Sequence, residues 1–210
     1  MIRIAGVALL FWHQIVGATL VSIDFTFQDY NFAVFTGGNG SGDVVFRVSY
    51  DSNAPDGNSG DTNVGSYTGT EVLRTGGQTS SIVPTIIQVF SNGSGNAGRD
   101  EFSVIPQRNF SPALPVFGIQ IENATFQMFG PASQMFTSDA PPLTPAFVSG
   151  ANSALVQVVS GESAIGQAFG QDEFHVDSAP VPEPSAYILL LAVLAGMFSV
   201  FRLRPGTRER

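Results

Sequence analysis

Short apolar runs separated by turn-forming residues limit most strongly what this chain of 210 residues can fold into. Residues 23–27 alternate between apolar and polar side chains, and the run 44–50 places Val44, Phe46, Val48 and Tyr50 on one face. Similar runs follow at 86–90, 102–105, 116–121, 126–129 and 155–159. Gly, Asn, Asp, Ser and Pro fill the segments between them, a pattern typical of antiparallel strands. We therefore expect an all-β fold, an antiparallel β-sandwich of the jelly-roll-like kind.

The composition supports a packed β domain. Only 12% of the residues are charged, no lysine is present, and the chain holds 23 Gly, 13 Pro and 18 Phe. A coiled coil or helical bundle needs more Lys, Glu and Ala, and a disordered chain has fewer aromatic residues. The absence of cysteine excludes thiol catalysis, cysteine-ligated metals and disulfides.

Charge is distributed unevenly along the chain. Residues 19–181 contain fifteen acidic residues and four arginines, a net charge of −11. Such an acidic body repels phosphate groups, so we expect no nucleic-acid partner. The other five arginines lie near the two ends of the chain.

The N-terminal segment has the three parts of a secretory signal peptide. Arg3 supplies the positive charge, an apolar core covers residues 4–11 and resumes at 15–16, and Gly17 and Ala18 are small. We expect cleavage after Ala18, which leaves 19–176 as the ectodomain. The alternative is a buried N-terminal helix or strand.

The C-terminal segment predicts a membrane anchor. Residues 186–201 carry no charge, and as a helix they would span roughly 24 Å of a hydrocarbon core about 30 Å thick. Residues 177–185 form a Pro-rich stalk before this span, and residues 202–210 form a basic tail. Arginines directly after a span favour a cytoplasmic tail. We expect an exported protein, held at the cell envelope by a single C-terminal transmembrane helix before processing.

Three elements follow one another in a characteristic order: Pro182, Glu183 and Pro184, then the short apolar span, then the arginines Arg202 and Arg204. This arrangement resembles the PEP-CTERM sorting signal of Gram-negative bacteria over residues 181–210. The resemblance implies an exosortase-type membrane peptidase as partner and a destination in the envelope or extracellular matrix. An ordinary single-span anchor is the alternative. Residues 48–52, 65–67, 119–123 and 136–141 resemble a recurring ectodomain of PEP-CTERM proteins that has no established activity.

One polar loop is a candidate calcium site. Three aspartates, Asp51, Asp56 and Asp61, alternate with Asn53, Asn58 and Asn63 within thirteen residues. Calcium prefers six to eight oxygen ligands, but the order departs from an EF-hand and lacks its closing glutamate. A solvated surface loop is the default interpretation, with the three aspartates as the first ligands to test. We expect no other cofactor.

No set of residues predicts catalysis. Residues 93–98 spell GxGxxG but lead into another apolar run, which favours a hairpin loop over a dinucleotide site. Ser163 lacks the GxSxG elbow of a hydrolase, and His175, the one histidine beyond the signal peptide, is expected at the surface. The glutamates at strand-like positions, Glu71, Glu101, Glu122 and Glu162, are not paired by any motif.

We therefore expect a non-enzymatic protein of the envelope or matrix that is linked to extracellular polysaccharide. A carbohydrate-binding module is the first alternative, with Tyr30, Tyr50 and Tyr67 as exposed candidates for stacking on sugars. A polysaccharide hydrolase at the cell surface is the second alternative.

Overall fold

Strands account for more than half of residues 20–36 and 40–179, the parts of the chain that the computed structural model describes. Among these residues the helical segments are short: α2 (Ala33–Thr36), η1 (Asn96–Gly98), η2 (Pro145–Gly150) and η3 (Gln171–Glu173). The strands are β1 (Leu20–Asn31), β2 (Ser41–Asp51), β3 (Val64–Thr75), β4 (Gln78–Thr79), β5 (Val83–Phe90), β6 (Asp100–Pro106), β7 (Leu114–Val116), β8 (Ile119–Ile121), β9 (Asn123–Gly130), β10 (Ser153–Ser160), β11 (Ser163–Gly170) and β12 (Phe174–Ser178).

The strands of the main sheet pair almost entirely in chain order. The order is β11-β10-β9-β6-β5-β3-β2-β1-β12, with β4 beside β3, and every pairing is antiparallel. The prediction of an all-β antiparallel fold is confirmed. The jelly-roll connectivity is wrong, because strands that follow one another along the chain lie side by side rather than crossing between two sheets. Only β12 departs from chain order, when it returns to the free side of β1.

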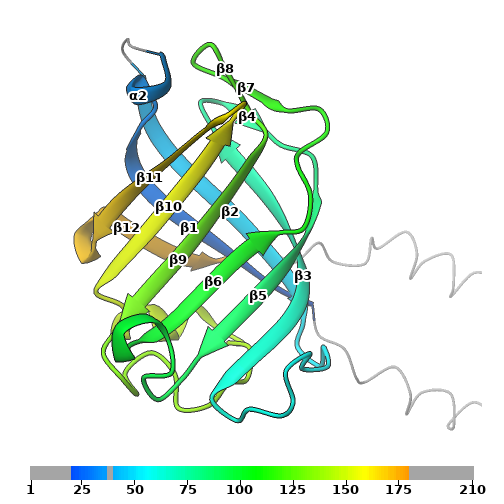
Figure 1. Cartoon of the computed structure of the whole chain (residues 1–210), viewed down its shortest axis with the longest axis vertical. Helices are drawn as coiled ribbons and strands as arrows, with labels where there is room; N and C mark the ends of the chain where they lie inside the picture. Colours follow the sequence, from blue (N-terminus) through cyan, green and yellow to red (C-terminus); the bar gives the residue numbers. More distant parts are fainter. Residues whose placement is uncertain (1–19, 37–39, 180–210) are drawn as a thin grey trace, which may run out of the picture. The chain divides into compact units, whose positions relative to one another are not determined.

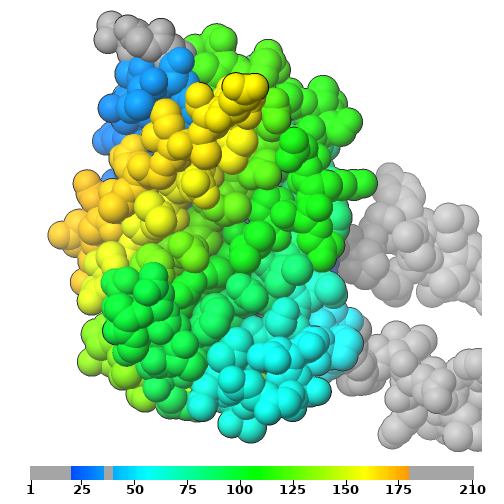
Figure 2. Space-filling view, in the orientation of Figure 1, coloured from blue at the N-terminus to red at the C-terminus, as the bar shows by residue number. Residues whose placement is uncertain are grey.

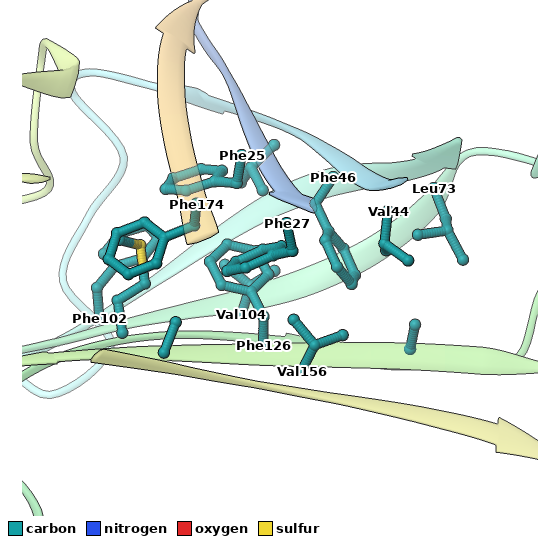
Figure 3. Packing of buried hydrophobic residues seen from close by; sticks show 14 of the residues in the cluster. Phe25, Phe27, Val44, Phe46, Leu73, Phe102, Val104, Phe126, Val156 and Phe174 are labelled. Atoms are coloured by element: carbon teal, nitrogen blue, oxygen red, sulfur yellow. The ribbon is translucent and has the colours of Figure 1, made fainter. Parts of the chain in front are cut away.

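The sheet curls so that β1 and β2 face β6 and β9 across one aromatic core (Figures 1 and 3). Phe126 of β9 lies at its centre, with its ring centroid 4.6 Å from that of Phe25 on β1 and 4.8 Å from that of Phe46 on β2. Phe102 of β6 stacks on Phe25 at 5.4 Å. All four rings are fully buried. The alternation of apolar residues places them here, since every second residue of a strand faces the same side.

Side chains join the end of β1 to the edge strand β11. Tyr30 donates its hydroxyl hydrogen to the carbonyl oxygen of Ile165 at 2.7 Å. The backbone N–H of Asn31 donates to Oε1 of Gln167 at 2.7 Å, and the amide of Gln167 donates back to the carbonyl of Asp29 at 3.4 Å. The part of β1 that extends beyond its pairing with β12 is thus tied to the edge strand β11 by side chains.

The predicted strand over residues 116–121 is wrong, because the chain reverses in its middle. Phe117 and Gly118 have positive φ values of 51° and 86° and form the turn between β7 and β8. Val116 and Ile119 pair across this hairpin. The apolar pattern could not reveal the turn, since Phe117 carries no turn signal and a single glycine is compatible with a strand.

The domain continues slightly beyond the predicted boundary at residue 176. Asp177 pairs with Asp24 and Ser178 with Ile23, so β12 includes two residues that the sequence assigned to the stalk. The next N–H, of Ala179, donates to the carbonyl of Ser22 at 2.9 Å. The predicted signal peptide at 1–18, the predicted transmembrane span at 186–201 and the predicted basic tail at 202–210 lie outside the described residues, so they stay predictions. Within residues 20–36 and 40–179, no helix has the length and apolar character needed to cross a membrane.

Candidate functional site

The predicted sorting residues, Pro182, Glu183, Pro184, Arg202 and Arg204, lie outside the described part of the chain. The sorting signal therefore stays a prediction.

The three aspartates of the polar loop bind their own backbone. Oδ1 of Asp51 accepts the N–H of Asn53, and Oδ1 of Asp61 accepts the N–H of Asn63, at 2.8 and 2.9 Å. Oδ1 of Asp56 accepts the N–H groups of Asn58 and Ser66, both at 2.8 Å. The contacts to Asn53, Asn58 and Asn63 are Asx turns, which shape a loop without a metal, and the contact to Ser66 ties the loop to β3. In residues 20–36 and 40–179 no three Asp, Glu or His side chains gather as a metal site, so the loop does not bring the three carboxylates together. Calcium binding stays a prediction.

The tyrosines proposed as an exposed sugar platform are buried, so that prediction is wrong. Tyr30, Tyr50 and Tyr67 are 0%, 2% and 5% exposed. Their rings face the core, and the hydroxyl groups of Tyr50 and Tyr67 donate to the carbonyl oxygens of Pro142 and Asp139 in the long loop before β10. Tyr50 and Tyr67 thus fix this loop, and Tyr30 bonds to Ile165, so none of the three rings offers a surface.

Two glutamates are also enclosed. Glu71 of β3 is fully buried, with one oxygen 3.4 Å from the hydroxyl of Thr85 and the other without a partner. Burial raises the pKa of Glu71 to about 8, although the Thr85 hydrogen bond lowers it slightly. Glu101 accepts hydrogen bonds from Ser103 and Gln127. Both residues are thus enclosed by the folded chain.

The GxGxxG segment is a hairpin loop, as the sequence predicts. It connects the antiparallel strands β5 and β6 and contains the one turn of η1. Ser94 donates to the carbonyl of Asn63 at 2.8 Å, so this loop contacts the Asp/Asn-rich loop at one end of the domain. Figure 2 shows both segments at the surface at the lower end of the view.

Asp100, at the start of β6, holds this hairpin loop to the segment after β9. One of its oxygens accepts the N–H of Gly93 at 2.9 Å, and the other accepts the N–H groups of Met135 and Phe136 at 3.0 and 3.1 Å. Burial alone would raise the pKa of Asp100, but these backbone donors outweigh it and hold the pKa below its ordinary value. The sequence offered no signal for this role, because the partners lie up to 36 residues away.

Replacing Asp100 by asparagine is expected to lower the free energy of unfolding at pH 7 by about 2 kcal/mol, because an amide NH2 would face backbone N–H groups. The depressed pKa stabilises the fold fully above the ordinary value of 3.8, and this stabilisation is lost as the pH falls through the folded value. Urea unfolding at pH 7 and pH 3 measures both effects, with the exposed Asp172→Asn as control. A loss that is the same at both pH values would contradict this assignment.

The outer face of β1, β2 and β3 carries a partly exposed ion-pair group of one carboxylate and two guanidiniums. Arg47 donates from Nε and Nη2 to the two oxygens of Asp24, both at 2.8 Å, and Arg74 donates from Nη2 to Oδ2 at 2.7 Å. Burial alone would raise the pKa of Asp24, but the bonds and charges of the two arginines outweigh it and hold the pKa low. This group fixes the positions of three side chains from three strands.

An open groove of about 710 Å³ lies beside this ion-pair group. Its lining includes Asp24, Asp43, Arg74, Thr75, Phe117 and Asp177. His175 lies next to it, with Nε2 3.8 Å from the carboxylate of Asp177, and its side chain is 52% exposed, which confirms the predicted surface position. The groove is the candidate functional site. The sequence analysis missed it because its residues come from five separate segments.

Comparison of the chain with known protein families, with curated proteins and with solved structures gave no match.

Proposed function

We propose that the protein is an exported, non-enzymatic domain of the cell envelope or extracellular matrix, delivered there by a PEP-CTERM sorting signal. In this proposal a secretory signal is removed after Ala18, and an exosortase-type peptidase processes the chain at Pro182, Glu183 and Pro184. The delivered β domain then associates with extracellular polysaccharide.

The observation that carries the proposal is where the folded domain ends. β12 pairs with β1 through Ser178, and the backbone bond from Ala179 to Ser22 closes this edge. The chain divides into two units after Ala179, and the Pro-Glu-Pro motif begins three residues later. A cut at the motif therefore leaves every described strand intact, as a sorting signal requires.

The enclosed carboxyl groups of Glu71 and Glu101 favour the non-enzymatic reading over a hydrolase. A glycosidase needs two carboxyl groups that flank a sugar in an open cleft. Both of these side chains are at least nine-tenths buried. Glu71 instead contacts Thr85, and Glu101 accepts hydrogen bonds from Ser103 and Gln127.

Intact mass of the protein from its native host, measured separately for membrane and medium, tests the proposal. We expect a species that lacks residues 1–18 and the segment after about Pro184. Replacing Pro182, Glu183 and Pro184 together by alanine should retain the tail, whereas the exposed Glu162→Ala should be processed normally. A native species that still ends at Arg210 would contradict the sorting signal and leave an ordinary anchor.

A further inference from the structure

One outer face of the domain is almost free of charge. This neutral face consists of the even-numbered residues of β5 and β11 and the odd-numbered residues of β6, β9 and β10, which alternate with the core positions. Glu101 is the one charged residue among them. Figures 1 and 2 look onto the neutral face, which lies at the front of the domain.

The single charge of the neutral face is shielded. Glu101 is 5% exposed. Its carboxylate accepts hydrogen bonds from the hydroxyl of Ser103 at 2.5 Å, the amide of Gln127 at 2.9 Å and the backbone N–H of Asn96 at 3.2 Å. These donors compensate the carboxylate within the fold, so the neutral face presents amide, hydroxyl and apolar groups to its surroundings.

The outer face on the other side of the core is charged. Strands β12, β1, β2 and β3 carry there the residues Asp24, Asp43, Arg47, Asp51, Arg74 and Asp177. Because residues 19–181 have a net charge of −11, two copies of the chain repel each other where their carboxylates meet. The neutral face is a surface through which two copies can approach without this repulsion.

The polar side chains of the neutral face are complementary to themselves. Gln88, Ser103 and Gln127 stand in one row across β5, β6 and β9, and Thr125 pairs with Gln157 across β9 and β10. Amide and hydroxyl groups both donate and accept hydrogen bonds, whereas a charged group needs a partner of opposite charge. A two-fold dimer requires such a patch, since the same surface serves on both copies.

The neutral face also has the size of an interface. Ile86 pairs with Ile105, which is 39% exposed, and Leu155 pairs with Gln127, so apolar side chains lie between the polar ones. Four of the five strands contain eight residues, which makes the face about 24 Å wide and about 26 Å long. The resulting area of about 600 Å² equals what one partner contributes at the lower end of stable interfaces.

We propose that the neutral face binds the neutral face of a second copy of this chain in a two-fold dimer. Amide, hydroxyl and aliphatic side chains of β5, β6, β9, β10 and β11 form the contact. We expect a dissociation constant of about 10 µM, because the contact is small and largely polar. The inference does not depend on the sorting signal, since the folded domain alone supplies the contact.

Sedimentation velocity of the full chain in detergent, at concentrations from about 1 to about 100 µM, tests the dimer. The wild type should change from monomer to dimer over this range. Gln157→Glu and Gln157→Arg place a charge on an exposed residue of the neutral face, and each should weaken association at least tenfold, because either charge would be desolvated without an opposite partner. The matched controls Gln78→Glu and Gln78→Arg change an exposed residue of β4 and should leave the dissociation constant unchanged.

Thr125→Glu on β9 repeats the test at a second position if the Gln157 variants unfold, with the exposed Thr79→Glu on β4 as its control. A wild type that stays monomeric at every concentration would overturn the proposal, whether or not the neutral face then binds a polysaccharide. A dimer that none of the neutral-face variants weakens, as association through another segment of the chain predicts, would also overturn it. Stronger association of Gln157→Arg than of the wild type would show a general effect of net charge and would equally overturn the proposal.

Discussion

Replacing Glu71 by glutamine is expected to raise the free energy of unfolding at neutral pH and to flatten its dependence on pH. Burial raises the pKa of Glu71 to about 8, from an ordinary value of 4.5. The folded protein therefore holds a proton that the unfolded chain releases between these two values. As far as Glu71 determines it, the free energy of unfolding is highest below pH 4.5, falls as the pH rises, and reaches its lower limit above about pH 8. At pH 7 the loss is on the order of 3 kcal/mol.

Urea unfolding at pH 5, 6, 7 and 8 measures this effect. Wild-type and E71Q proteins should have similar stabilities at pH 5 and should diverge steadily toward pH 8, with E71Q the more stable. Glu162→Gln serves as control, because this side chain is exposed in the turn between β10 and β11. Parallel pH profiles for the wild type and E71Q would show that Glu71 is not the group responsible.

Truncating Phe126 to alanine is expected to destabilise the domain by about 3–5 kcal/mol, the usual cost of removing a buried phenylalanine. Its ring contacts those of Phe25, Phe27 and Phe46, which come from the two strands opposite β9. The cavity would open at the centre of the core, where the surrounding strands are held by their ladders and cannot collapse inward.

Thermal and urea unfolding of Phe126→Ala and Phe126→Leu check this prediction. The leucine variant should lose less than half as much stability, because it fills most of the cavity. Ile105→Ala on β6 is the control, since this side chain is 39% exposed on the outer face and should cost about 1 kcal/mol or less. Equal losses for Phe126→Ala and Ile105→Ala would contradict the central place of Phe126 in the core.

The burial of Tyr50 could be predicted from the sequence. Apolar alternation places it on the same face as Val44, Phe46 and Val48, and that face is the core. Expecting the tyrosine at the surface relied on residue type, since most of the phenylalanines were assigned to the core, but a buried tyrosine satisfies its hydroxyl group by bonding to a loop. Position within a strand was here a better guide than residue type.

Half of the strands were predictable, while the long strand β3, the edge strands β11 and β12, the strand order and the groove were not. Alternation is local and identified six runs that lie within β1, β2, β5, β6, β9 and β10. Strand order depends on contacts between distant residues, which periodicity does not record. The ion pair of Asp24 and Arg74 joins residues 50 positions apart, and Phe117 reaches the groove only through a turn that the sequence did not indicate.

The pairing of β12 determines how the domain responds to mechanical force. Five residue pairs join β12 to β1, whereas ten join β1 to β2. A pull on the C-terminal end of the chain enters the sheet at Ala179 and acts first on this short ladder. β12 would detach before any other strand, which would expose the edge of β1 and withdraw Phe174 from the core. The other strands of the main sheet, from β1 to β11, would stay paired. Under tension the domain therefore lengthens by a few residues at its last strand before the rest of the sheet bears the force.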